Sequence, residues 1–328
     1  MKIARWMNRG ALEEGFVEAD GAVPLPDGIT VADLLRGGLA FAHEVHAATV
    51  GRAARALADV ELLPPVVPAA VRDFAVFEEH VEGMSADAQG RPNVPAPWYE
   101  SPRFYFTNPH TLHGSGARIR PPATERLDYE LEVAVVLGGE PGEDLDPAEA
   151  ATRIFGYAIM NDWSARDIQG REMNVRLGPA KGKDFATSLG PWIVTADELA
   201  DRIDDDGFLA LRAEVSVNGV LTGADLLSNM AWTFPELISY ASRASRVVPG
   251  DVIGSGTTGN GGCLAELWGL AGGALVPPPL QAGDVVSMRV ERLGELVGIV
   301  DPARMHPHEI PPARRRPQPR ARSVPARE

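Results

Sequence analysis

Short runs of β-forming residues, separated by glycine and proline, extend from about residue 67 to residue 300 and most constrain the fold of this chain. Runs of about four to eight residues bounded in this way are typical of strands, whereas helices need longer periodic stretches. The candidate strands are 103–107, 131–137, 155–160, 192–195, 213–217, 251–255 and 284–290. Frequent strands with few helices between them predict an α+β fold, mostly β, with a curled sheet instead of a doubly wound one.

Three helices and one hairpin complete this pattern. Asn218-Gly219 separates two β-rich segments, and Asn-Gly favours the type I′ turn of a two-residue hairpin. The candidate helices cover 147–154, 164–172 and 234–244.

The chain divides into three predicted regions. Residues 1–66 form a candidate small N-terminal domain, because the paired prolines Pro64 and Pro65 stop a helix and favour extended backbone. The main domain covers 67–301. The segment 302–328 is rich in proline and arginine, which is typical of a disordered tail, although its arginines also leave open a nucleic-acid or targeting patch.

Composition excludes several classes of protein. With 45% hydrophobic and 23% charged residues, the 328-residue chain has an ordinary globular composition. A formal charge of −14 argues against nucleic acid as the main partner, since phosphate binding needs a basic surface. The single cysteine, Cys263, excludes an internal disulfide framework. We find neither a signal-peptide pattern nor an apolar stretch long enough to span a bilayer, so we expect a cytoplasmic protein with no membrane partner.

Glu130 and Glu132 are the first candidates for chemistry. They belong to the stretch 127–136, which alternates apolar and charged residues and predicts a single strand. Side chains two apart on a strand point to one face, so the two carboxylates would repel each other. A solvated strand face explains the pattern without any ligand. A hard divalent ion such as Mg²⁺, or Mn²⁺ or Ca²⁺, is the alternative, because such ions prefer carboxylate oxygens.

Asp162 follows an apolar run, where side chains emerge from a sheet into a site. It is a candidate metal ligand, a candidate N-cap of the next helix, or both. In that helix Arg166 and Gln169 are three apart and therefore share a face.

Candidate cations and a candidate base lie elsewhere in the chain. Lys181 and Lys183 share a glycine-rich loop, and either could offset carboxylate repulsion and stabilise an oxyanion. His80, in a helix-like segment, is the candidate general base because histidine titrates near neutral pH. Glu266 is flanked by apolar residues, so it is either an anomalously buried carboxylate or a functional partner, for example of a histidine. Cys263 is interpreted as a small core residue.

The segment 254–259 matches the dinucleotide pattern G-x-G-x-x-G, yet we reject that interpretation. The fingerprint needs a helix opening inside a βαβ unit and an acidic residue about 20 positions later. Further glycines and a proline-rich stretch follow here. A flexible loop that brings backbone close to a substrate explains the sequence better.

Several motifs together resemble the fumarylacetoacetate hydrolase superfamily, in family order and spacing. They are Asp-Tyr-Glu-Leu-Glu at 128–132, Asn-Asp-Trp-Ser-Ala-Arg-Asp-Ile-Gln at 161–169, Gly-Lys-Asp-Phe at 182–185, Gly-Pro-Trp at 190–192, Val-Pro-Gly-Asp-Val-Ile at 248–253 and Gly-Asp-Val-Val at 283–286. The resemblance implies a rolled mixed β-sheet catalytic domain with a smaller N-terminal domain, usually in a homodimer.

The resemblance also implies roles for individual residues. Its metal ligands would be Glu130, Glu132, Asp162 and, as in the two-domain fumarylacetoacetase branch, Asp73. His80 and Glu266 would activate water, while Arg166, Gln169 and Lys183 would contact the substrate or the leaving group. The remaining substrate-binding positions would be Tyr105, Thr187 and Thr257.

The implied activity is metal-dependent hydrolysis of a C–C bond in a β-diketone or 2-oxo-acid, such as an acylpyruvate or a fumarylacetoacetate-like compound. Met173 or a neighbour replaces an aromatic substrate contact of the family, which leaves the acyl group open. The alternatives are oxaloacetate decarboxylation and isomerisation or hydration of oxo-diacids in aromatic catabolism. A third hypothesis is a non-catalytic metal-binding scaffold, which the presence of His80, Glu266 and Lys183 disfavours.

Overall fold

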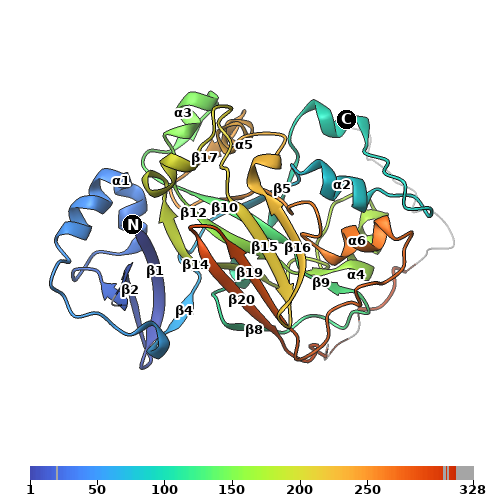
Figure 1. The fold of residues 1–328 in the computed structure, drawn as a ribbon, viewed down its shortest axis with the longest axis horizontal. Coiled ribbons are helices and arrows are strands. Elements are labelled where there is room, and N and C mark those ends of the chain that lie inside the picture. Colours follow the sequence, from blue (N-terminus) through green and yellow to red (C-terminus); the bar gives the residue numbers. More distant parts are fainter. Residues whose placement is uncertain (20, 306–307, 309, 315–328) are drawn as a thin grey trace, which may run out of the picture.

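A computed structural model of the chain describes residues 1–19, 21–305, 308 and 310–314, and it has an α+β fold that is mostly β (Figure 1). The larger sheet is mixed and carries the N-terminal strands at one end. Its strands, in spatial order, are β3 (Gly21–Pro24), β2 (Ala11–Glu18), β1 (Lys2–Asn8), β14 (Thr187–Thr195), β12 (Ile154–Asp162), β10 (Leu131–Leu137), β18 (Val252–Gly254), β5 (Val71–Phe74) and β6 (Phe104–Thr107), with β4 (Glu61–Leu63) on β1 and β7 (Leu112–His113) on β14.

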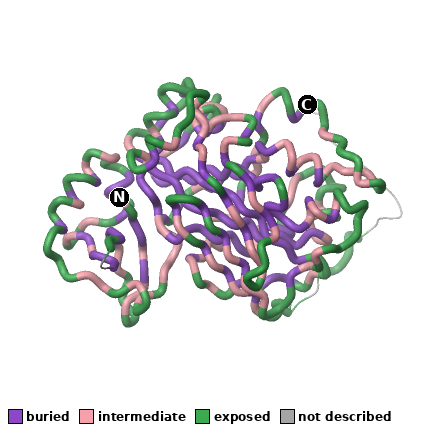
Figure 2. The backbone as a smooth tube through the Cα atoms, viewed as in Figure 1, coloured by how far each residue is buried: buried purple, intermediate pink, exposed green. Residues whose placement is uncertain are grey.

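A second, smaller sheet packs against the middle of the first. Its order is β16 (Val220–Leu226), β15 (Arg212–Val217), β19 (Val285–Val290), β20 (Gly294–Val300) and β8 (Ala117–Ile119). Two short ladders join β9 (Leu127–Asp128) to β13 (Ser164–Ala165) and β11 (Gly142–Glu143) to β17 (Arg246–Val247). The main hydrophobic core lies between the sheets, and Figure 2 shows their central strands as the most buried part of the backbone.

Helices cover the outside of this sheet pair. The α-helices are α1 (Val31–Ala47), α2 (Glu78–Met84), α3 (Pro147–Ala151), α4 (Arg166–Met173), α5 (Phe234–Ser242) and α6 (Leu264–Leu270). Short 3-10 helices cover Leu57–Asp59, Ala96–Glu100, Pro109–Thr111, Ala196–Arg202 and Leu227–Asn229. The apolar side of α1 packs on β10, β12 and β14 from the face opposite the main core. Within the described residues, the helices are too short or too polar to cross a membrane.

The N-terminal strands are joined to the main sheet by backbone hydrogen bonding. β1 pairs antiparallel with β14, so that Lys2 is opposite Val194 and Ile3 opposite Ile193. The elements before Pro64 nonetheless project from one end of the molecule, on the left of Figure 1. A domain boundary near residue 66 stays a prediction.

The predicted strands are present, with some different ends. The stretch 127–136 is not one strand, because β9 ends at Asp128 and β10 begins at Leu131. The break has a local cause: β9 pairs with β13, β10 pairs with β12, and the Glu130 N–H between them donates to Asn161 Oδ1 at 3.0 Å.

All three predicted helices were also too long. The helix expected over 234–244 ends at Ser242. The helix expected over 147–154 ends at Ala151, because Ile154 already begins β12. The helix expected from residue 164 begins at Arg166, since Ser164 and Ala165 pair with β9.

The predicted hairpin joins β15 and β16. Asn218 and Gly219 both have positive φ, 52° and 78°, as a type I′ turn requires. Most of the predicted disordered tail, residues 306–307, 309 and 315–328, lies outside the described residues.

Candidate active site and metal centre

Three carboxylates converge where β5, β10 and β18 meet. Asp73 and Glu132 flank Gly254, which is paired with Asp73 in the parallel β5–β18 ladder. Oxygen atoms of Asp73, Glu130 and Glu132 all lie within 4.8 Å of one another. A methyl group on Gly254 would lie 2.8 Å from Asp73 Oδ1 and 3.0 Å from Glu132 Oε2, so the glycine leaves the space that these side chains fill.

Asp73 and Glu132 are buried and lie within hydrogen-bonding reach of each other. In the described part of the chain, no group donates a hydrogen bond to either oxygen of Glu132 or to Oδ1 of Asp73. Burial and then Asp162 raise the pKa of Asp73 to about 8. Burial and then Asp73 raise the pKa of Glu132 well above its usual value. Burial of two ionised carboxylates without hydrogen-bond donors lowers the stability of the fold unless a cation binds them.

Glu130, by contrast, is ionised. Burial alone would raise its pKa, but Lys183, Arg166 and His80 lower it to about 2. Arg166 Nη2 lies 2.8 Å from Glu130 Oε1, and Lys183 Nζ donates to Glu130 Oε2.

Asp162, at the end of β12, is held by three donors. Lys183 Nζ donates to Asp162 Oδ2 at 2.7 Å, and the hydroxyl of Tyr105 donates to the same oxygen. Thr187, opposite Asp162 in the β12–β14 ladder, donates to Oδ1 at 3.4 Å. The helix α4 is preceded by Ala165, so the N-cap interpretation of Asp162 is wrong.

The structure decides between the two lysines of the glycine-rich loop. Lys183 is buried between Glu130 and Asp162. The side chain of Lys181 is 72% exposed and pairs with Asp184 at 2.7 Å. Lys183 is therefore the lysine of the site.

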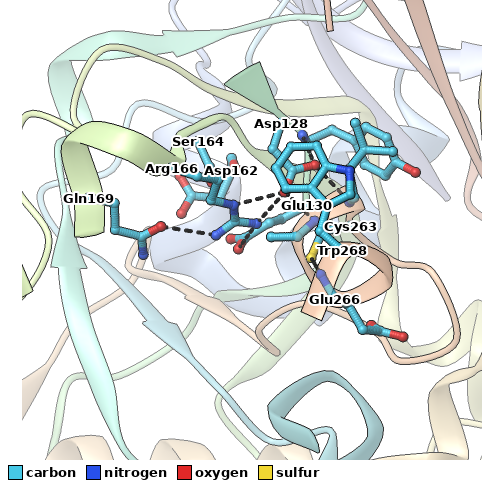
Figure 3. Close-up of polar contacts among 12 residues, drawn as sticks. Asp128, Glu130, Asp162, Ser164, Arg166, Gln169, Cys263, Glu266 and Trp268 are labelled. Carbon is cyan, nitrogen blue, oxygen red and sulfur yellow. Dashed lines mark hydrogen bonds and ion pairs between the residues drawn. The ribbon is translucent and has the colours of Figure 1, made fainter. Parts of the chain in front are cut away.

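Arg166 links the carboxylate cluster to α6 through Asp128 (Figure 3). Arg166 Nε donates to Asp128 Oδ2 at 2.8 Å, and Arg166 Nη1 donates to Gln169 Oε1 at 3.1 Å. The fully buried Asp128 also accepts the N–H groups of Leu264 at 2.8 Å and Ala265 at 3.0 Å. One carboxylate thus fixes both the guanidinium and the first turn of the helix that carries Glu266.

Sequence reasoning did not single out Asp128. Its only signal was its place in the alternating series with Glu130 and Glu132, and the helix that it holds is more than 130 residues away in the chain.

His80 on α2 and Glu266 on α6 face each other. His80 Nδ1 lies 3.7 Å from Glu266 Oε2, and both residues are buried. The close approach of the two helices depends on Gly83 and Gly269. A methyl group on Gly269 would lie 1.9 Å from the Gly83 carbonyl oxygen, and one on Gly83 would lie 2.4 Å from Glu266 Cγ.

Cys263 lies beside this pair and is fully buried. It precedes α6, and its sulfur accepts the N–H of Glu266 at 3.4 Å. The same sulfur lies 3.6 Å from His80 Nδ1.

The glycine-rich segment after β18 forms a loop, as predicted, because the next helix begins only at Leu264. The Thr258 N–H donates to the Leu131 carbonyl oxygen at 2.9 Å, which ties this loop to the start of β10. Thr257 is buried there, and its predicted role toward the substrate stays a prediction.

The residues present fit a divalent cation. Lys183 and Arg166 pair with Glu130 and Asp162, whereas Asp73 and Glu132 offer buried oxygens that a cation could bind in place of protons. Oxygen donors alone favour a hard ion such as Mg²⁺, Mn²⁺ or Ca²⁺.

With this fold and site, the chain belongs to the fumarylacetoacetate hydrolase family. The family's C-terminal domain, described as "Fumarylacetoacetate (FAA) hydrolase C-terminal", matches residues 69–301.

Three individual proteins show the range of its relatives. Fumarylacetoacetase of Arabidopsis thaliana is 30% identical over 258 residues, which cover 64% of this chain and only 61% of that protein. The oxaloacetate tautomerase YisK of Bacillus subtilis is 28% identical over 245 residues, 73% of each chain. The solved structure of a fumarylacetoacetate hydrolase from the psychrophilic Exiguobacterium antarcticum superposes with a TM-score of 0.69 at 26% identity, covering 93% of this chain and 100% of that one.

Proposed function

We propose that the protein is a metal-dependent hydrolase that cleaves a C–C bond in an acylpyruvate or a fumarylacetoacetate-like β-diketone. One observation carries this proposal: the helix that bears Glu266, which faces His80, is joined through Asp128 and Arg166 to a buried carboxylate cluster whose oxygens on Glu132 accept no hydrogen bond in the described part of the chain. Such a site combines a base for water with ligands for a cation that binds adjacent oxygens of an oxo-acid.

Asp73, Glu130 and Glu132 would hold the cation, with Asp162 as a further ligand. When bound, a divalent cation supplies Lewis-acid catalysis and a template for the oxygens of a 2-oxo-acid or 1,3-diketone. Mg²⁺ is the first candidate and Mn²⁺ the second.

His80 would take the proton of the attacking water at Nε2, the nitrogen that faces away from Glu266. Its Nδ1 faces Glu266 Oε2 at 3.7 Å, and that carboxylate would stabilise the imidazolium formed. The second oxygen of Glu266 accepts the Gly261 N–H at 2.9 Å, which fixes the orientation of the carboxylate.

Lys183 would stabilise the oxyanion that forms when water adds to the carbonyl carbon. Burial alone would lower the pKa of this lysine, but Asp162 and Glu130 raise it, so the ammonium stays charged. A fixed cation in a buried site stabilises developing negative charge strongly.

The C–C bond then breaks with its electron pair on the carbon between the two carbonyl groups, which gives a carboxylic acid and an enolate. Proton return to the enolate carbon gives a 2-oxo-acid from an acylpyruvate and a 3-oxo-acid from a fumarylacetoacetate-like compound, so one water is consumed for each bond broken. Arg166 and Gln169, hydrogen-bonded to each other, would bind the enolate side of the substrate. Tyr105, Thr187 and Thr257 would complete the substrate contacts.

The acyl group of the substrate would be selected by residues other than those given catalytic roles above. Met173, at the end of α4, is 51% exposed. The resemblance implies that Met173 or a neighbour replaces an aromatic substrate contact of the family, so this segment would select the acyl group. The homodimer and the cytoplasmic location also stay predictions.

The test is loss of diketone absorbance for acetylpyruvate, fumarylpyruvate and fumarylacetoacetate with Mg²⁺ or Mn²⁺. The control is Glu132→Gln, which keeps the shape of the side chain but removes its charge. Turnover by the wild type that is lost in Glu132→Gln supports the proposal. A folded, metal-loaded wild type that leaves all three substrates unchanged contradicts it and favours tautomerisation or decarboxylation of oxaloacetate, or isomerisation of an oxo-diacid.

A further inference from the structure

A second group of potential metal ligands lies next to the carboxylate cluster. His80, Cys263 and Glu266 offer a nitrogen, a sulfur and an oxygen within 4.8 Å of one another. The three residues are 8%, 0% and 1% exposed, so their polar atoms compete little with water. This donor set differs in kind from the all-oxygen cluster of Asp73, Glu130 and Glu132.

The spacing of the three donors suits a tetrahedral ion. With Zn–S and Zn–N bonds of typical length, a tetrahedral angle puts sulfur and nitrogen about 3.6 Å apart. Cys263 Sγ and His80 Nδ1 are 3.6 Å apart, and His80 Nδ1 and Glu266 Oε2 are 3.7 Å apart. The nitrogen–oxygen distance is too long for a hydrogen bond, whereas the sulfur–nitrogen distance is that of a thiol hydrogen-bonded to an imidazole, and both are ordinary for two ligands of one metal.

Glu266 supplies an independent sign of a missing partner. Its Oε1 accepts the Gly261 N–H, whereas Oε2 receives no hydrogen bond in the part of the chain that the structure describes. A buried carboxylate oxygen in that condition is costly unless something binds it. The free oxygen is the one directed toward His80 Nδ1.

We propose that His80, Cys263 and Glu266 form a second cation site, selective for a thiophilic divalent ion such as Zn²⁺, with water or substrate as the fourth ligand. Binding replaces the thiol proton, which is released to solvent, and forms one bond each from sulfur, nitrogen and oxygen to the ion. Thiolate and imidazole prefer Zn²⁺ to Mg²⁺, so the two sites would select different metals.

Occupation of this site would inhibit the proposed reaction, because the ion would take Nδ1 of His80 and the carboxylate that supports it. Mg²⁺ or Mn²⁺ in the carboxylate cluster would activate, and Zn²⁺ at the second site would inactivate. This consequence rests on the proposed function, whereas the binding itself does not.

Co²⁺ is the probe that tests binding directly. A thiolate bound to Co²⁺ gives a charge-transfer absorption in the near ultraviolet that oxygen and nitrogen ligands do not give. Because Cys263 is the chain's single cysteine, such a band can come from no other residue. The band should appear on titration of the wild type and disappear when excess Zn²⁺ is added.

Two variants separate this site from the carboxylate cluster. Cys263→Ser keeps a side chain that can accept the Glu266 N–H and should lose the band completely. Glu132→Gln should keep it, since that change affects only the other site. Circular dichroism establishes that each variant is folded.

The result that overturns the proposal is a folded wild type that shows no thiolate band, either after equilibration with Co²⁺ or after refolding in its presence. A band that Glu132→Gln abolishes would also overturn it, because the sulfur would then be joining the first site. Neither outcome depends on turnover, so failure of this proposal is distinct from failure of the proposed function.

Discussion

Asp128 Oδ2 accepts a hydrogen bond from Arg166 Nε at 2.8 Å, while the same carboxylate receives two N–H groups from the start of α6. The arginine that pairs with Glu130 and the helix that carries Glu266 are therefore fixed by one buried anion. Asp128 is a positioning residue between the two halves of the site.

Asp128→Asn should lower both the stability and the activity of the protein, because Asp128 holds Arg166 and the start of α6. The variant removes one of the two buried carboxylates that pair with the Arg166 guanidinium, and loss of one partner of a buried pair typically costs about 3–5 kcal/mol. Activity should fall about 10- to 100-fold, as for other groups that orient ligands from outside. Denaturant unfolding and kcat/KM measure the two effects. Asp301→Asn, which breaks the surface pair with Arg118, is the matched control and should cost about 1 kcal/mol or less.

The two loop lysines give a second matched comparison. Lys183→Met leaves Glu130 and Asp162 without their shared cation, so we expect loss of turnover and destabilisation of about 3–5 kcal/mol. Lys181→Met removes only an exposed pair and should change stability by about 1 kcal/mol or less. Equal effects of the two substitutions on turnover and thermal unfolding would contradict the assignment of Lys183 to the site.

The metal-free protein should lose stability as the pH rises. Asp73 has a pKa of about 8 in the folded chain and an ordinary value of 3.8, so between these values the folded state holds a proton that the unfolded state has released. The free energy of unfolding therefore falls across this window, whereas a carboxyl with a lowered pKa would do the reverse.

Chelated protein unfolded at a series of pH values tests this slope. Saturating Mn²⁺ should remove the slope, since the cation takes the place of the proton, and Glu132→Gln should reduce it. A metal-free protein that gains stability steadily from pH 5 to about pH 8 would show that Asp73 is not buried as described.

Gly254→Ala should weaken the metal site although it replaces none of the proposed ligands. The added methyl would lie 2.8 Å from Asp73 Oδ1, 3.0 Å from Glu132 Oε2 and 2.4 Å from Met160 Cε. We expect weaker metal binding and about 1–3 kcal/mol of destabilisation, as is typical of overpacking. Isothermal titration with Mn²⁺ measures the affinity. Gly170→Ala, where no atom lies within 4 Å of the added methyl, is the control and should bind metal as the wild type does.

The local parts of this fold could be predicted from the sequence because they depend on neighbouring residues. Asn218-Gly219 specifies its own turn, and the apolar run 131–137 forms β10 over those same residues. The pairing of β1 with β14 could not be predicted in this way, because it joins segments more than 180 residues apart and leaves no pattern in either one.

The candidate site, like the fold, could be predicted only where it depends on neighbouring residues. Residue type and motif order pointed to Glu130, Glu132 and Asp162, but residue type alone did not distinguish Lys181 from Lys183. The motif at 182–185 favoured Lys183, and burial separates the two lysines in the structure. The proximity of Cys263 to His80 likewise depends on how α2 packs on α6.

Product stoichiometry tests the central claim most directly. The wild type with Mn²⁺ and an acylpyruvate should release pyruvate and the matching carboxylic acid in equal amounts. His80→Ala, which removes the base, should still bind Mn²⁺ but release neither product. Substrate that is consumed without pyruvate and acid, or equal release by His80→Ala and the wild type, would contradict hydrolysis by the His80–Glu266 pair.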